Sequence, residues 1–293
     1  MLSFSTMVAA HSTGGGGWPA ARGARVLLAA LLAVAPLLAF APAIASASAP
    51  ARAPAATTAA SAQWRGLERR IESAYFQQDA AGLEALSATL TAGAGNAADA
   101  ADAKDEELRS YYAALIAYRL ALLANHEQTR AWPFTAQCVD RLNRVLVRDT
   151  GSAEALALQS ACLALQSDLD PWRSPLAAPL SLARIDKALK LAPDNPRVLL
   201  LGSLAARDRP KLFGGDARQG FEMMRRAVSA FERQTAVTTS LPGWGAADAF
   251  TDMAQDYLGL GDTLAARNVL ERALLIAPDF AQARRLMAEI VAG

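Results

Sequence analysis

Residues 250–278 constrain the fold more than any other segment, because apolar and small residues recur there at helical spacing in two successive runs. Gly261 and Asp262 separate the runs, since glycine tolerates the turn and aspartate can cap the second helix. Pro278 cannot continue a helix and ends the second run. The spacing predicts a helix hairpin, and a hairpin of this kind needs neighbours to bury its apolar face. The spaced residues are Phe250, Met253, Ala254, Tyr257, Ala266, Leu270 and Ala273.

This spacing resembles the tetratricopeptide (TPR) repeat, W-x₂-L-G-x₂-Y…A-x₃-F…P, with like-for-like replacements. The resemblance is strong over residues 247–293 and degenerate over about 62–235. It implies a superhelix with a binding surface, and it does not identify the partner. Residues 280–291 have room for only half a repeat, which is typical of a helix that covers the open end of a solenoid.

Three further motifs are similar to those of an exported bacterial TPR-like group of undefined function. That resemblance implies no activity. The motifs are Asn195-Pro196-Arg197, Pro210-x₂-Phe213-Gly214-Gly215-Asp216 and Pro242-x-Trp244-Gly245.

Helical periodicity continues through most of residues 62–293, and no sustained period-two run predicts a strand. Counting the helical segments gives about eleven helices, which pair as five hairpins and a C-terminal capping helix. We therefore expect an all-α protein whose single domain, residues 62–293, is a TPR-like helical-hairpin solenoid.

Residues 1–45 have the layout of a secretory signal peptide. Arg22 and Arg25 precede an apolar run at 26–34, and small residues follow up to Ala45-Ser46-Ala47. This pattern predicts cleavage after Ala45 or Ala47 and a periplasmic or secreted bacterial protein. The alternative is that the segment stays uncleaved and anchors the chain in the membrane. Residues 46–61 are rich in proline and alanine and are expected to form a disordered linker.

The two cysteines, Cys138 and Cys162, both belong to the part of the chain predicted to be exported. We expect helices at about 133–149 and 152–167, which places the two cysteines at nearly equal height on antiparallel neighbours. An oxidising compartment permits a disulfide there. The alternative is a pair of buried thiols in an alanine-rich core.

The candidate binding groove lies on the first helices of the last repeats. Its polar part is acidic to neutral and its apolar part is rich in leucine, which would suit an amphipathic or basic peptide. The alternative is that the leucines belong to the core. The groove residues are Arg197, Leu200, Leu201, Leu204, Asp248, Thr251, Asp252 and Gln255.

Three aromatic residues lie in loops longer than a regular repeat requires: Trp172, Phe213 and Trp244. Each either fills the core or is presented to a ligand. Because Arg197 and Trp244 are expected at the same edge of the solenoid, they are candidates for a cation–π contact.

The sequence lacks a recognisable set of catalytic or metal-binding residues. His126, the one histidine beyond the predicted signal, lies in a polar turn, and neither cysteine has a predicted histidine partner. No cluster has metal-ligand spacing, and no cofactor motif is complete. With residues 1–45 removed, the chain is nearly neutral, so it has no basic surface for nucleic acid.

These observations favour a non-catalytic module that binds a protein or peptide, as a scaffold or assembly factor in the periplasm. The alternative is a periplasmic receptor for a small molecule or lipid that serves a transporter, and an enzyme is the least favoured class. Contact with a membrane is expected only through an uncleaved signal segment.

Overall fold

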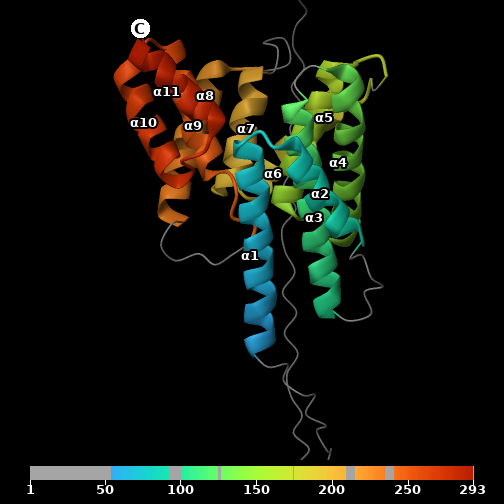
Figure 1. The fold of residues 1–293 in the computed structure, drawn as a ribbon. Coiled ribbons are helices and arrows are strands. Elements are labelled where there is room, and N and C mark those ends of the chain that lie inside the picture. Colours follow the sequence, from blue (N-terminus) through green and yellow to red (C-terminus); the bar gives the residue numbers. More distant parts are fainter. Residues whose placement is uncertain are drawn as a thin grey trace, which may run out of the picture. The chain divides into compact units, whose positions relative to one another are not determined.

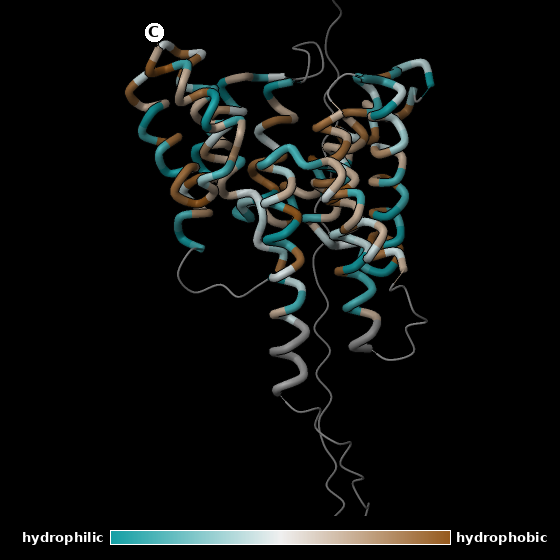
Figure 2. Tube along the Cα trace, in the orientation of Figure 1, coloured by the Kyte–Doolittle hydropathy of each residue, from teal (hydrophilic) through white to brown (hydrophobic). Residues whose placement is uncertain are grey.

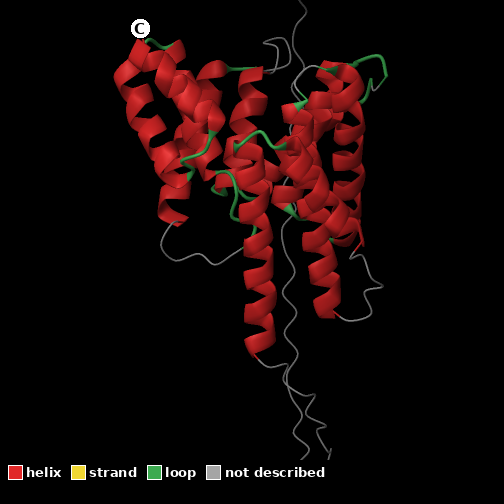
Figure 3. Ribbon diagram, in the orientation of Figure 1, coloured by secondary structure: helices red, strands yellow, loops and turns green. Residues whose placement is uncertain are grey.

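The computed structural model describes residues 54–92, 100–124, 127–173, 175–208, 215–234 and 241–292. These ranges contain eleven helices and no strand (Figure 3), which confirms the all-α prediction. The helices are α1 (Pro54–Phe76), α2 (Ala80–Ala92), α3 (Ala100–Leu123), α4 (Gln128–Arg148), α5 (Ala153–Leu169), α6 (Ala177–Leu191), α7 (Pro196–Asp208), α8 (Ala217–Gln234), α9 (Ala246–Gly259), α10 (Thr263–Ile276) and α11 (Ala281–Ala292).

Each odd-numbered helix from α1 to α9 packs against the helix that follows it, and α11 packs on α10 (Figure 1). Successive hairpins contact one another through α4 and α5, α5 and α7, and α8 and α9. This arrangement is the predicted series of five hairpins with a capping helix. The described domain is therefore a helical-hairpin solenoid.

The hairpin of α9 and α10 follows the predicted spacing. Gly261 has φ 78°, which a residue with a side chain rarely adopts, and the Asp262 carboxylate accepts a hydrogen bond from the Ala265 backbone N–H at 2.9 Å. Ala254 and Ala266 have no exposed surface. The small residues therefore lie where the two helices approach each other.

Helix α1 begins at Pro54, within the segment predicted to be a linker, so residues 54–61 are helical rather than disordered. Alanine is the strongest helix former, and proline fits the first position of a helix, which accounts for the earlier start. The predicted signal peptide and the beginning of the predicted linker lie outside the described residues.

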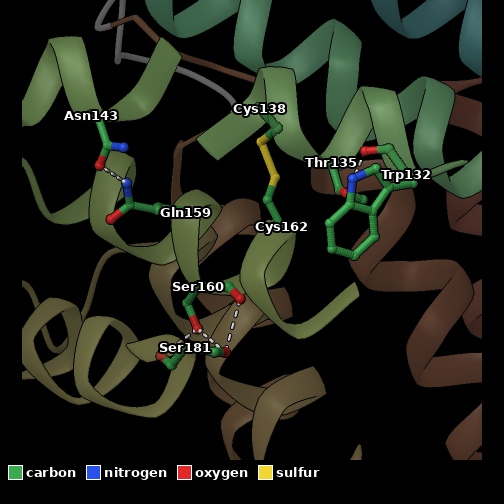
Figure 4. Close-up of a disulfide and its surroundings, with 8 residues drawn as sticks. All are labelled: Trp132, Thr135, Cys138, Asn143, Gln159, Ser160, Cys162 and Ser181. Atoms are coloured by element: carbon green, nitrogen blue, oxygen red, sulfur yellow. Dashed lines mark hydrogen bonds between the residues drawn. A yellow bond between two sulfur atoms is a disulfide. The ribbon is translucent and has the colours of Figure 1, made fainter. Parts of the chain in front are cut away.

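A disulfide joins Cys138 of α4 to Cys162 of α5, which confirms the predicted bridge (Figure 4). The two Cα atoms are 6.2 Å apart and both side chains are fully buried. Since α4 and α5 belong to successive hairpins, the bridge joins the second hairpin to the third. Beside it, Gln159 donates to Asn143 at 2.8 Å, and the Ser160 and Ser181 hydroxyls each donate to the backbone carbonyl of the other residue at 2.8 Å.

Helix α4 begins at Gln128, earlier than predicted, and Pro133 lies inside it. The Gln128 side chain donates to the Leu169 carbonyl at 3.0 Å, which attaches the start of α4 to the end of α5. This tertiary contact offsets the backbone hydrogen bond that proline cannot donate.

Hydrophobic and hydrophilic residues both occur along the helices (Figure 2). The buried residues of α8 recur at helical spacing, whereas α5 is buried on all sides over residues 155–160. The buried apolar residues form one cluster that runs from Trp64 to Leu286. None of the helices in the described ranges combines the length and the hydropathy that crossing a membrane requires.

Candidate functional site

Helix α1 connects the early and late hairpins of the solenoid. In Figure 1 it stands between α2–α5 on one side and α7–α11 on the other. The Glu68 carboxylate accepts hydrogen bonds from the Gly243 backbone N–H at 2.8 and 3.0 Å and from the Tyr112 hydroxyl at 2.5 Å. One turn later, Glu72 accepts from the Gly245 N–H at 3.2 Å. Two carboxylates of α1 therefore attach it to the loop that precedes α9.

That loop, residues 241–245, places Trp244 in the interior. The indole is 1% exposed, and its N–H donates to the Tyr111 hydroxyl at 3.0 Å. Gly245 has φ 105°, and a Cβ atom there would lie 3.1 Å from Phe231. The peptide bond between Leu241 and Pro242 is cis. The loop thus requires glycine where the backbone turns into α9.

Two ion pairs with buried arginines connect helices of different hairpins. Arg119 of α3 donates to both carboxylate oxygens of Asp248 in α9, each at 2.7 Å, and the Arg119 side chain is 2% exposed. Arg197 of α7 pairs with Glu154 of α5 at 2.9 Å. These pairs, together with Glu68, Glu72, Tyr111, Tyr112 and Trp244, are called the polar network below.

Burial raises the pKa of carboxyl groups in and beside the polar network. Desolvation raises the pKa of Glu72 to about 8, and the neighbouring Asp248 and Glu68 carboxylates add to the effect. Desolvation likewise raises the pKa of Asp252 to about 7, with Asp248 as the next cause. The Asp248 carboxylate keeps Arg119 charged by raising its pKa, against the opposing effect of burial. Glu72 and Asp252 therefore bind protons more readily near neutral pH than ordinary carboxyl groups do.

Most of the predicted groove is interior in this structure. Arg197, Leu200, Leu201, Asp248 and Thr251 are buried. Leu204 and Asp252 are half-buried, and Gln255 alone of the set is exposed.

The cation over the Trp244 ring is Arg119, at 5.2 Å, whereas the predicted partner Arg197 is held by Glu154. Two arginines lie near this loop, and only the tertiary structure decides which of them faces the ring.

The three predicted loop aromatics have different surroundings. Trp244 is buried, Trp172 is 93% exposed, and Phe213 lies outside the described residues, as does His126. The Asp170 carboxylate accepts hydrogen bonds from the backbone N–H groups of Trp172 and Arg173 at 3.1 and 3.0 Å.

An open cleft of about 590 Å³ lies at the C-terminal end of α1. Its wall combines aromatic and aliphatic side chains with two arginines, and no carboxylate lines it. No local sequence pattern marks this cleft, because its lining comes from α1, the start of α2, α3, α4 and the start of α11. The residues that matter below are Tyr75, Phe76, Leu122, Arg130, Phe280 and Arg285.

No group of three or more histidine, cysteine, aspartate or glutamate side chains in the described ranges has the geometry of a metal site. The polar network can hold helices together and bind protons. The cleft and the exposed Trp172 are two features of the described residues that can contact another molecule.

No protein-family model and no curated protein matches this sequence. Among solved structures, the fold is similar to that of the HusA haemophore from Porphyromonas gingivalis. The TM-score is 0.51 at 18% sequence identity, and the match covers 65% of this chain and 90% of that chain. The likeness shows a shared all-helical fold.

Proposed function

We propose that this chain is an exported, non-catalytic binding protein of the TPR type, which acts as a protein-interaction module in the bacterial periplasm. The signal-like layout of residues 1–45 supports export. The buried disulfide supports it as well, because structural disulfides persist in oxidising compartments. In this role the chain is a scaffold or assembly factor for envelope proteins.

The observation that carries the protein-interaction role is the exposure of Trp172, whose side chain is 93% exposed. The Asp170 carboxylate accepts a hydrogen bond from the Trp172 backbone N–H, and the Gln128 side chain donates to that carboxylate at 3.3 Å. The Arg173 guanidinium lies 4.3 Å above the Trp132 ring. Tryptophan dominates many protein interfaces.

Leu176 and Leu180, which are 67% and 43% exposed, follow Trp172 along the chain. Exposed tryptophan and leucine side chains are of the kind that gather at interaction sites. The proposed contact surface is therefore Trp172, Leu176 and Leu180.

The test is affinity capture after crosslinking in living cells, with three forms of the full chain. The proposal expects one dominant envelope protein with the wild type, lost with Trp172→Ala and retained with Leu275→Ala. Leu275 is a matched control because it is also exposed, at 83%, but on α10. Equal capture by all three forms, or no specific capture, contradicts the proposed surface.

The second candidate function is a receptor for a small molecule. The cleft beside Tyr75 favours it, since about 590 Å³ is within the usual range of ligand sites, roughly 300–1,000 Å³. The structural neighbour is a haemophore, which makes haem the first compound to try.

Haemin titration followed by absorbance, and native mass spectrometry of the purified chain, test the receptor function. A saturable spectral change or a co-purified compound of constant mass supports it. If the mass spectrum shows only the chain without a ligand and the absorbance of haemin does not change, the receptor function is contradicted. The protein-interaction role then remains as the proposed function.

A further inference from the structure

The geometry points to a binding site for an amphipathic carboxylate in the cleft bounded by the end of α1, the end of α3, the start of α4 and the start of α11. This inference rests on the receptor function proposed above and assigns its site and ligand class. The carboxylate binds at Arg130 and Arg285, and the apolar body of the ligand lies against Tyr75, Leu122 and Leu123, which are half-buried, whereas Phe280 is buried behind them.

The aromatic wall is held in place from behind. Phe76 and Phe280 pack with ring centroids 4.2 Å apart, and Tyr75 lies 6.3 Å from Phe280. The Arg119 guanidinium lies 4.0 Å from the centre of the Tyr75 ring, and Asp248 fixes that guanidinium with two hydrogen bonds. The wall is therefore pre-organised, which lowers the entropy cost of binding.

The charge at the cleft is positive. Arg130 and Arg285 both line it and are both exposed, and none of its lining residues is acidic. Arg130 has an exposed partner, Glu127, at 3.3 Å, an ion pair of the kind that contributes little. Within the described ranges, no carboxylate forms an ion pair with Arg285. A guanidinium group binds a carboxylate through two parallel hydrogen bonds, so each of these two arginines offers a place for a ligand carboxylate.

The cleft suits an amphipathic molecule because part of its lining is apolar and part of it is positively charged. A purely polar anion would gain nothing from the half-buried side chains of Tyr75, Leu122 and Leu123, and a neutral apolar compound would gain nothing from the two arginines. The side-chain amides of Gln78 and Gln282, which also line the cleft, add donors and acceptors for the polar end of the ligand.

Fluorescence titration of the purified chain with 11-(dansylamino)undecanoic acid tests the site, because the dansyl emission rises in an apolar environment. Its methyl ester is the matched probe, with the same body and no charge. The expected result is saturable binding of the acid, with an affinity at least about tenfold above that of the ester, as for a lost charged hydrogen bond.

Two variants and one control locate the bound probe. Arg285→Gln and Arg130→Gln should each weaken binding of the acid by about tenfold. Arg284→Gln should leave it unchanged. Arg284 is the neighbour of Arg285 on α11, is also exposed, and lines an adjacent hollow with Gln77 and Asp279. All three variants lose one positive charge at an exposed position, so their melting temperatures should match the wild type.

Three results overturn the assignment: absence of saturable binding, equal affinity for the acid and the ester, or equal weakening by Arg284→Gln and Arg285→Gln. The receptor function is judged separately. If the wild type carries a co-purified compound whose occupancy Arg285→Gln leaves unchanged, the chain is a receptor whose site lies elsewhere.

Discussion

Arg119 and Asp248, 129 positions apart in the chain, form a bidentate ion pair with both hydrogen bonds at 2.7 Å. The pair joins α3 of the second hairpin to α9 of the fifth. The Arg119 guanidinium also lies beneath the Tyr75 ring of α1. One buried side chain thus contacts three hairpins of the solenoid and supports the wall of the cleft.

Removing one partner of the ion pair between Arg119 and Asp248 should lower the unfolding free energy of the protein. Arg119→Met or Asp248→Asn leaves the other partner buried without its counter-charge, which typically costs about 3–5 kcal/mol of unfolding free energy. Chemical denaturation of each variant measures the cost. The double variant should recover part of the loss, since both charges are then gone.

Arg144→Met is the control for the buried pair. Arg144 pairs with Asp140 on the surface of α4, where both side chains are about 60% exposed. Its loss should change the unfolding free energy by under about 1 kcal/mol. A cost for Arg119→Met no larger than the control's would contradict the importance of the buried pair.

The stability of the protein should fall as pH rises through the neutral range. Burial raises the pKa of Glu72 from its ordinary value of 4.5 to about 8, so the folded state holds a proton that the unfolded state has released. The stabilisation from this proton is complete below about pH 4.5 and is lost by about pH 8. Glu72→Gln removes this titration.

Unfolding free energies measured between pH 5 and 8 test the role of Glu72. With Glu72→Gln, the unfolding free energy should fall less steeply with pH than in the wild type. The two slopes should differ by up to about 1.4 kcal/mol per pH unit, the value for one proton. Glu84→Gln, an exposed position on α2, should keep the wild-type slope. Identical slopes in all three proteins would show that Glu72 does not titrate in this range.

The disulfide should be complete in the exported protein. Alkylation without reduction is expected to add no label, because both cysteines are paired and no other cysteine exists. Replacing both by serine should lower the unfolding free energy by roughly 3 kcal/mol, given the 24-residue separation. Two labels on the unreduced protein would refute the bridge.

Trp244 and Trp172 should respond in opposite ways to truncation. Trp244→Ala removes a fully buried indole and leaves the Tyr111 hydroxyl without its donor, so we expect a loss of about 3–5 kcal/mol. Trp172→Ala should leave the melting temperature unchanged, since its side chain is in solvent. Thermal melts followed by circular dichroism compare them directly. Equal destabilisation would mean that the Trp172 indole is not free in solution.

Local pattern accounts for most of the fold prediction. The spacing from Phe250 to Pro278 and the proline and glycine punctuation predicted the hairpins, because helix periodicity and turn chemistry act within a few residues. The nearly equal height of Cys138 and Cys162 followed from counting residues outward from a single turn. These features depend on short-range geometry, so they can be predicted from the sequence.

The candidate surfaces depend on packing between distant segments. The sequence placed Leu200 and Arg197 on a groove but could not show that both would be buried. The cleft joins Tyr75, Arg130 and Phe280 from three separate helical segments, and no local pattern links them. The sequence by itself thus determined the helical elements and their pairing, and it placed the two cysteines at equal height without deciding between a bridge and free thiols. Only the tertiary structure decided which polar groups are buried together and where a cleft stays open, because burial depends on how whole helices pack.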